Sequence, residues 1–219
     1  MTAAKVIKAR PAKSIKPSKA GTPVSEMSSS DKLEMVLPAA VDMMTLSSVG
    51  AYMFFDDVDP ETARPLCEFI IKSNFVFEDD VPLTIFINSP GGSVYDGWGI
   101  IDLMASSRLK IQTVGIGLIA SMAAVMLVAG TKGMRMMTPN SYVMTHQYSE
   151  GLEGKFHELV AHRDHQDELH NKFIKFFVKR TKMTAKQVND ILLGTTDKML
   201  SPKECLKYGL IDVVKNPWS

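Results

Sequence analysis

The chain has little cysteine, almost no net charge and few aromatic residues among its 219. Two cysteines, Cys67 and Cys205, are too few for a disulfide framework, which favours a reducing compartment and two small apolar side chains. A formal net charge of +1 provides no overall field to attract nucleic acid or a membrane surface. Because 45% of the residues are hydrophobic and 22% charged, the composition excludes a collagen, a coiled coil and a wholly disordered chain.

The basic residues are unevenly distributed along the chain. Residues 1–20 contain six lysines or arginines and no acid, but they lack the apolar core segment of a secretory signal. Residues 1–31 are rich in Lys, Pro, Ala, Ser and Gly and show no apolar periodicity. We therefore predict a disordered basic tail over residues 1–31, or a propeptide that is cleaved, and one folded domain over residues 32–219.

One uncharged stretch, residues 111–130, has the length of a membrane span. It contains polar residues, and the pair Gly115 and Gly117 interrupts it in the middle. A buried strand that ends there, followed by a buried helix, explains the same hydropathy. We therefore predict no membrane-spanning segment at this place and no membrane partner.

Short apolar runs alternate with amphipathic segments from residue 49 onward. The expected strands cover residues 50–55, 81–88, 109–114, 141–146 and 210–214. The expected helices follow the N-cap Asp59, cover residues 94–107, 121–129 and 152–180, and follow the capping boxes Thr184–Gln187 and Ser201–Glu204. This alternation predicts an α/β fold with right-handed crossovers.

The long helix expected at residues 152–180 has apolar ends and a nearly all-polar middle, residues 161–168. Such a helix packs at its ends and projects in between. Four of the five histidines lie on it, at positions 157, 162, 165 and 170, in a spacing that forms no open metal-ligand pattern. We therefore expect surface histidines and no metal site.

Three short segments are candidates for chemistry. Residues 88–93, Asn-Ser-Pro-Gly-Gly-Ser, follow a strand, and their glycines can present bare backbone N–H groups, although no phosphate-binding pattern is present. Ser121 stands between a glycine-interrupted strand and an apolar helix, among small residues. His146 ends a strand. Taken singly, these segments are explained as a tight turn, a helix N-cap and a structural histidine.

Taken together, the segments resemble the proteolytic subunit of the Clp protease family over roughly residues 49–215. The matching stretches are residues 88–92, 120–124, 127–130, 139–141, 144–147, 200–202 and 208–212. The resemblance implies a crotonase-like α/β fold of stacked βαβ units, with the helix at 152–180 as a protruding handle. It also implies two stacked seven-membered rings that enclose a chamber.

The resemblance assigns the roles of a serine endopeptidase residue by residue. Ser121 matches the nucleophile, His146 the general base, and Asp197 the acid that orients the histidine. Gly92 and Met122 match the residues whose backbone N–H groups form the oxyanion hole. This arrangement is the serine-triad template, which needs neither a metal nor another cofactor.

The resemblance also implies partners. Peptides and unfolded proteins would be the substrates, delivered by an AAA+ unfoldase, because no Walker-type loop is present. Phe86 matches one wall of the docking pocket for that ATPase, whereas Thr84 stands where a second aromatic is common. Thr196 replaces an arginine that normally couples the two rings. The expected location is the cytoplasm, an organellar matrix or stroma, or a host cytoplasm.

Two alternatives stay open at this point. The chain could be an inactive ring subunit that assembles with active paralogues, or an acyl-CoA hydratase or isomerase of the crotonase fold, whose oxyanion hole also uses backbone N–H groups. Asp190 and Asp212 also lie close enough in the sequence to orient a histidine, and only the resemblance selects Asp197.

Overall fold

The computed structural model describes residues 45–147 and 155–218. The predicted tail, residues 1–31, lies outside these ranges. The strands are β1 (Ala51–Phe54), β2 (Leu83–Ser89), β3 (Ile111–Ala120), β4 (Arg135–Met137), β5 (Tyr142–Thr145), β6 (Lys198–Leu200) and β7 (Val213–Val214). The helices are α2 (Pro60–Val76), α3 (Val94–Ser106), α4 (Met122–Ala129), α5 (Phe156–Arg180), α6 (Ala185–Gln187) and α7 (Pro202–Tyr208), with a 3-10 turn at Leu46–Val49 and a π-helical turn at Val188–Leu192.

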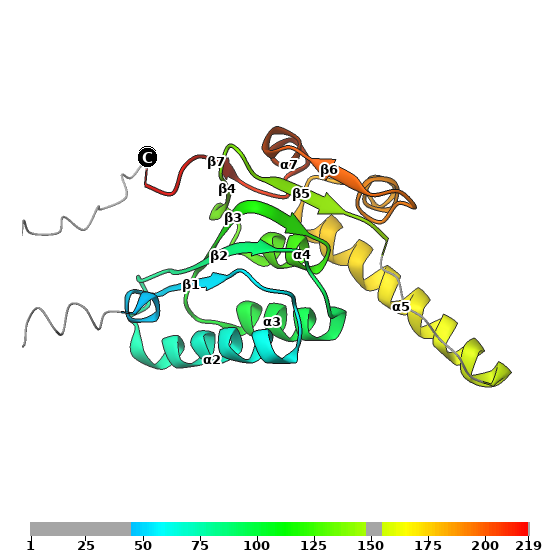
Figure 1. Ribbon diagram of the computed structural model, residues 1–219, viewed down its shortest axis with the longest axis horizontal. Helices are drawn as coiled ribbons and strands as arrows, with labels where there is room; N and C mark the ends of the chain where they lie inside the picture. The colour runs from blue at the N-terminus through cyan, green and yellow to red at the C-terminus, as the bar shows by residue number, and fades with distance from the viewer. Residues whose placement is uncertain (1–44, 148–154, 219) are drawn as a thin grey trace, which may run out of the picture. The chain divides into compact units, whose positions relative to one another are not determined.

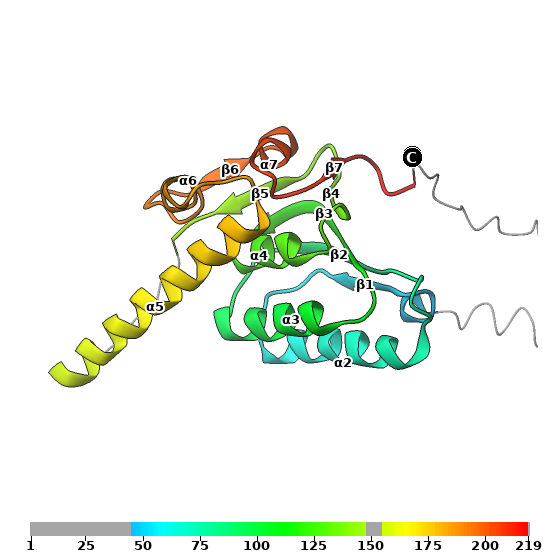
Figure 2. The same ribbon diagram turned by 180° about the vertical axis from the view of Figure 1, so that it is seen from behind.

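These strands form one sheet in the order β1-β2-β3-β4-β7, and all pairs along this path are parallel. The sheet branches at β3, whose second half also pairs in parallel with β5, and β6 adds to β5 in the antiparallel direction. Helices α2 and α3 lie side by side (Figures 1 and 2). The predicted α/β fold class is confirmed.

The helix starts follow from local hydrogen bonds that the sequence indicates. The Asp59 carboxylate accepts the backbone N–H groups of Glu61 and Thr62, both at 2.8 Å, and these bonds hold its pKa below the ordinary value. The predicted capping boxes of Thr184 and Ser201 are present at the starts of α6 and α7. Each box satisfies backbone donors that a helix start otherwise leaves unpaired.

The prediction that a strand stops at Gly115–Gly117 is wrong. Strand β3 continues to Ala120, and the pairing with β2 jumps from Ile87↔Gly115 to Ser89↔Ile119. The glycines therefore mark a bulge, in which a Cβ atom on Gly115 would lie 2.9 Å from the Ile119 side chain. Residues 111–130 form β3 and α4, and no helix within the described ranges is both long and apolar enough to cross a bilayer.

The expectation that the long helix packs at both ends and projects in between is confirmed for its middle and its C-terminal end, but Val160 near the N-terminal end of α5 is 45% exposed. From His157 to Glu168 its described side chains are exposed or half-exposed, whereas Leu169, Phe173 and Phe177 are buried against the body. Figure 1 shows the start of α5 extending away from the sheet. The helix begins at Phe156 rather than at residue 152, and residues 152–154 lie outside the described ranges.

A largely buried ion pair joins β4 to the segment before β7. The Arg135 side chain is 3% exposed, and its Nε and Nη2 donate to the two carboxylate oxygens of Asp212 at 2.9 and 2.6 Å. The Asp212 carboxylate also accepts the N–H of Gly133 at 2.7 Å. Burial alone would raise the pKa of Asp212, but the hydrogen bonds and charge of Arg135 outweigh it and hold that pKa below its ordinary value.

We predict that Asp212→Asn lowers the free energy of unfolding at pH 7 by about 3 kcal/mol, because it leaves the Arg135 charge buried without its counter-ion. The pKa of Asp212 is lower in the folded than in the unfolded protein. The ionised carboxylate therefore stabilises the fold fully above its unfolded pKa of about 4, and this stabilisation is lost as the pH falls through the folded pKa. Urea unfolding at pH 7 and pH 3 measures this. If the unfolding free energies of wild type and Asp212→Asn differed by the same amount at pH 7 and pH 3, the stabilising role of the Asp212 carboxylate would be contradicted.

Candidate active site

Ser121 occupies a strained turn between β3 and α4. Its φ of 52° and ψ of −122° make it the one non-glycine residue with positive φ among residues 45–147 and 155–218. Its N–H donates to the Met144 carbonyl at 2.9 Å, and its own carbonyl accepts the N–H of Ala124 at 3.0 Å. Strained turns of this kind, from strand to helix, expose the hydroxyl of a catalytic serine.

The Ser121 hydroxyl does not cap the helix. It makes no hydrogen bond to the first turn of α4, so the explanation of Ser121 as an ordinary N-cap is wrong. The residue is instead half-exposed and lines two neighbouring pockets. A strained backbone and a hydroxyl unused by the helix are what a nucleophile requires.

The glycine loop after β2 packs directly against this turn. A Cβ atom on Gly91 would lie 2.7 Å from the Ala120 carbonyl oxygen and the Ser121 Cβ, and 2.8 Å from the Met122 nitrogen. On its other side the loop is bound to Val58, whose N–H donates to the Gly91 carbonyl at 2.8 Å. Gly91 and Gly92 have φ of 91° and 143°, so glycine is required both by backbone conformation and by space.

Within residues 45–147 and 155–218, two backbone N–H groups on the segments around Ser121 have no hydrogen-bond acceptor. Met122 is the first residue of α4, so its N–H has no intrahelical partner. Among the described residues, the N–H groups of Met122 and Gly92 donate no hydrogen bond to another protein group. The predicted oxyanion residues are thus two free donors, one on each of the two segments that meet at Gly91 and Ser121.

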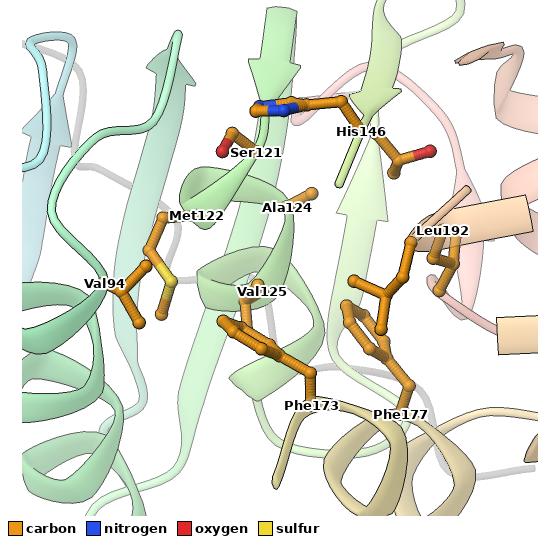
Figure 3. A pocket seen from close by; sticks show the side chains of 11 residues that line it. Val94, Ser121, Met122, Ala124, Val125, His146, Phe173, Phe177 and Leu192 are labelled. Atoms are coloured by element: carbon orange, nitrogen blue, oxygen red, sulfur yellow. The ribbon is translucent and has the colours of Figure 1, made fainter. Parts of the chain in front are cut away.

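His146 lies at the same edge of the sheet as Ser121. Ala120 pairs with Met144 in the parallel β3–β5 ladder, so the residues that follow each strand emerge together. Ser121 and His146 line the same two pockets, and Figure 3 shows the imidazole lying over the serine side chain. The structure therefore brings the predicted nucleophile and the predicted base together.

The hydrogen bonding of His146 fixes its tautomer. Nδ1 lies 2.7 Å from the backbone carbonyl oxygen of Gln147. A carbonyl oxygen can only accept, so Nδ1 carries the proton and Nε2 of the neutral ring is the free acceptor. This is the tautomer that a general base acting on a serine hydroxyl needs.

Asp197 comes directly before β6, and His146 comes directly after β5, its antiparallel partner. The last pair of this antiparallel ladder is Thr145 with Lys198, and beyond it the Gln147 N–H donates to the Gly194 carbonyl at 3.2 Å. Within the described part of the chain no hydrogen bond joins the side chains of His146 and Asp197, and Asp197 is exposed. Asp197 lines neither of the pockets that contain Ser121 and His146, and its role stays a prediction.

The two other candidate acids are engaged elsewhere. Asp212 binds Arg135, as described above. The exposed Asp190 carboxylate pairs with Lys186, and hydrogen bonds from Lys186 and then Asn189 hold its pKa below the ordinary value. Both acids therefore already have other partners.

An apolar pocket opens beside Ser121. Its walls come from Val94 of α3, Met122 and Val125 of α4, and Phe173 and Phe177 of α5 (Figure 3). The sequence reasoning did not assign the two phenylalanines to the site. The signal was available as the apolar C-terminal half of the long helix, but only the packing of α5 against α4 shows which pocket those side chains line.

Neither cysteine is a rival nucleophile. Both thiols are free, and burial raises the pKa of Cys205 to about 12 and, together with the charge of Asp96, raises that of Cys67. A protonated thiol is a poor nucleophile. Among the described residues no cluster of His, Cys, Asp and Glu has the arrangement of a metal site.

Comparisons with known proteins identify the family of this chain. The Clp protease family matches residues 43–217. An ATP-dependent Clp protease proteolytic subunit of Nephroselmis olivacea is 31% identical over 163 residues, which are 74% of this chain and 76% of that protein. Proteolytic subunit 1 of Prochlorococcus marinus subsp. pastoris is 42% identical over 132 residues, 59% of this chain and 65% of that protein. A proteolytic subunit of Deinococcus radiodurans is 38% identical over 133 residues, 60% of this chain and 64% of that protein.

The fold and the site define a serine-peptidase-like α/β subunit. The chain belongs to the Clp protease family. The predicted resemblance and the predicted function, a peptidase subunit of the Clp type, are thereby confirmed, and an acyl-CoA hydratase or isomerase is set aside.

We predict that Gly91→Ala greatly reduces peptide hydrolysis and lowers the unfolding free energy by about 1–3 kcal/mol, because the new methyl group meets backbone atoms on both sides of Ser121 and the φ of 91° disfavours it. Gly99→Ala in α3 is the matched control. Its Cβ would meet no atom within 4 Å, so it should keep full activity and gain up to about 1 kcal/mol. Wild-type turnover in Gly91→Ala would contradict the close approach.

Proposed function

We propose that Ser121 attacks the peptide carbonyl, that His146 Nε2 takes its proton, and that the N–H groups of Gly92 and Met122 hold the resulting oxyanion. The observation that carries this proposal is the strained turn at Ser121 beside two free N–H donors and a histidine in the correct tautomer. The apolar pocket next to Ser121 would take an apolar side chain of the substrate on one side of the cleaved bond.

The experiment for the nucleophile is Ser121→Ala. We expect peptide hydrolysis to fall by about 10⁴-fold or more and labelling by a fluorophosphonate probe to disappear. The unfolding free energy should change little, because the hydroxyl makes no capping bond. Ser93→Ala is the control, since the Ser93 hydroxyl caps α3 and its loss should cost stability without removing the labelled residue. Unchanged hydrolysis in Ser121→Ala would overturn the assignment.

We further propose that Asp197 becomes the hydrogen-bond partner of His146 Nδ1 when the site acts. The place of Asp197 directly before β6, the strand that pairs with β5, supports this role. The change needed is that Nδ1 moves from the Gln147 carbonyl to the Asp197 carboxylate. A carboxylate would stabilise the imidazolium formed during proton transfer more than a neutral carbonyl does.

Asp197→Asn should then lower turnover by about 10³–10⁴-fold without unfolding the protein. Asp190→Asn is the matched control, an exposed acid nearby that pairs with Lys186, and it should keep most activity. Steady-state kinetics with a fluorogenic peptide measures both variants. If Asp197→Asn retained more than about a tenth of the wild-type turnover, the Gln147 carbonyl would be the working partner of His146 and the triad would be wrong.

We propose that the chain assembles into two stacked seven-membered rings through apolar surfaces that a single subunit leaves exposed. Ile71, Phe75 and Val76 on α2 are 45%, 86% and 74% exposed, and Val160 on the projecting half of α5 is 45% exposed. Single subunits seldom leave such groups in water without a partner. Sedimentation velocity at neutral pH checks this, and a stable monomer would refute it.

An apolar surface on β1 and β2 is the docking site that we propose for the ATPase partner implied by the family. Met53 pairs with Phe86 in the parallel ladder and is 49% exposed, and the Trp218 ring lies 6.2 Å from the Phe86 ring. We propose that an AAA+ unfoldase docks here and feeds unfolded proteins to the chamber, which would lie in the cytoplasm or in an organellar matrix.

Phe86→Ser should weaken ATP-dependent degradation of a folded, tagged substrate while cleavage of short peptides persists, because the surface lies outside the pockets of Ser121. Phe86→Tyr keeps the ring and is the control. Degradation assays with a Clp-type ATPase compare the two variants. If neither wild type nor variant responds to the ATPase, the chain works as a self-contained peptidase on loose segments.

A further inference from the structure

A second pocket, which we call the basic pocket, lies away from Ser121. It is lined by the cations Lys132, Arg135, Arg180 and Lys182, with Asp212 as its one acid. The pocket lies between the C-terminal end of α5, the end of α7 and the loop that follows α4. It shares no lining residue with the two pockets that contain Ser121 and His146.

The charges around the basic pocket do not balance. Asp212 already accepts hydrogen bonds from two nitrogens of the Arg135 guanidinium, Nε and Nη2, so the charges of Asp212 and Arg135 compensate each other. In the described ranges, Lys132, Arg180 and Lys182 form no ion pair with an acidic side chain. Three positive charges therefore surround one cavity without a counter-ion from the described chain.

Arg180 is held in place rather than free in solvent. The side chain is half-buried, its Nη1 donates to the Gly130 carbonyl at 3.3 Å, and its guanidinium lies 5.4 Å from the centre of the Phe176 ring. Burial, and then the charge of Arg135, lower the pKa of Arg180. A guanidinium that is fixed, partly desolvated and next to a second cation is stabilised by an anion in its reach.

Lys182 is positioned by a close backbone approach. Its N–H donates to the Tyr208 carbonyl at 2.9 Å, and a Cβ atom on Gly209 would lie 2.9 Å from the Lys182 Cγ. Gly209 also ends α7 with a φ of 75°, so a glycine at this position both closes the helix and makes room for the lysine stem. The stem of Lys182, which lines the pocket, is thereby held at the end of α7.

We propose that the basic pocket binds a phosphate-class oxyanion, either inorganic phosphate or the phosphate of a small ester. Three uncompensated cations match a multiply charged anion better than a single carboxylate, and a guanidinium fork suits the geometry of phosphate oxygens. The cavity of about 150 Å³ has room for several water molecules, and so for one phosphate group.

The competing explanation is that these cations only complement the C-terminal dipoles of α5 and α7. Lys179 separates the two explanations. Lys179 lies in the last turn of α5 together with Arg180 and carries the same charge as Arg180. Unlike Arg180, it does not line the pocket. If the dipole explanation is correct, replacing Lys179 and replacing the pocket lysines change phosphate binding equally.

Calorimetric titration of the full chain with inorganic phosphate, and separately with adenosine monophosphate, tests the proposal at fixed ionic strength and pH 7. We expect saturable binding of at least one of the two ligands, with one site per chain, and the tighter ligand identifies the source of the phosphate. Lys132→Ala with Lys182→Ala should weaken this binding by at least about tenfold, as for a lost charge-assisted contact. Both lysines are exposed, so the double variant should fold.

Lys110→Ala with Lys179→Ala removes the same number of exposed charges outside the pocket and should bind as wild type does. Arg180→Gln should also lose binding, and its circular dichroism shows whether it is folded; if it is not, the lysine pair decides. Absence of saturable binding to both ligands, or equal weakening in the control pair, would overturn the proposal. Peptide hydrolysis is not the readout, so the result is independent of the catalytic assignment.

Discussion

The catalytic edge of this protein depends on one close approach, between the backbone of the glycine loop after β2 and the turn that carries Ser121. Any side chain on Gly91 would meet the Ala120 carbonyl and Ser121 itself. Among the described residues, the N–H groups of Gly92 and Met122, one on each of the two contacting segments, donate no hydrogen bond. The Ser121 backbone is held in a strained conformation by hydrogen bonds to Met144 and Ala124. Strain of this kind persists only where the surroundings determine it.

The branched sheet supplies the remaining groups of the site. Because β5 pairs in parallel with the second half of β3, His146 emerges beside Ser121. Because β6 returns antiparallel to β5, Asp197 comes directly before the strand that pairs with β5. The imidazole Nδ1–H contacts the Gln147 carbonyl, and the Asp197 carboxylate is the acceptor that we propose for the active state. On this account, activity depends on a small change of partner at one hydrogen bond, with the strands unmoved.

Much of this arrangement could be predicted from the sequence, for identifiable reasons. The Asp59, Thr184 and Ser201 helix starts were predictable because capping is a local interaction. The alternation of β-branched runs with amphipathic segments gave the α/β class. Strands β4 and β6 could not be predicted, because three residues carry no periodicity and their pairing is decided by distant segments. The glycines of β3 were misjudged because a bulge and a strand end look alike until the partner strand is known.

The roles within the site divide in the same way. The resemblance to the Clp protease family selected Ser121, His146 and Asp197, but no residue pattern revealed the Gln147 contact of the histidine or the phenylalanines of α5 in the apolar pocket. The place of the phenylalanines depends on how the C-terminal half of α5 packs against α4, and this packing is decided by the whole fold. The basic pocket is a similar case, since its cations come from two segments about 45 residues apart in the sequence.

The most direct test of the central claim is a crystal structure of the protein after reaction with a phosphonate inhibitor. The account predicts a covalent bond at Ser121 Oγ and a phosphonyl oxygen within about 2.7–3.1 Å of both the Gly92 and the Met122 nitrogen. An adduct whose oxygen points away from these two N–H groups, or a bond to any other residue, would contradict it.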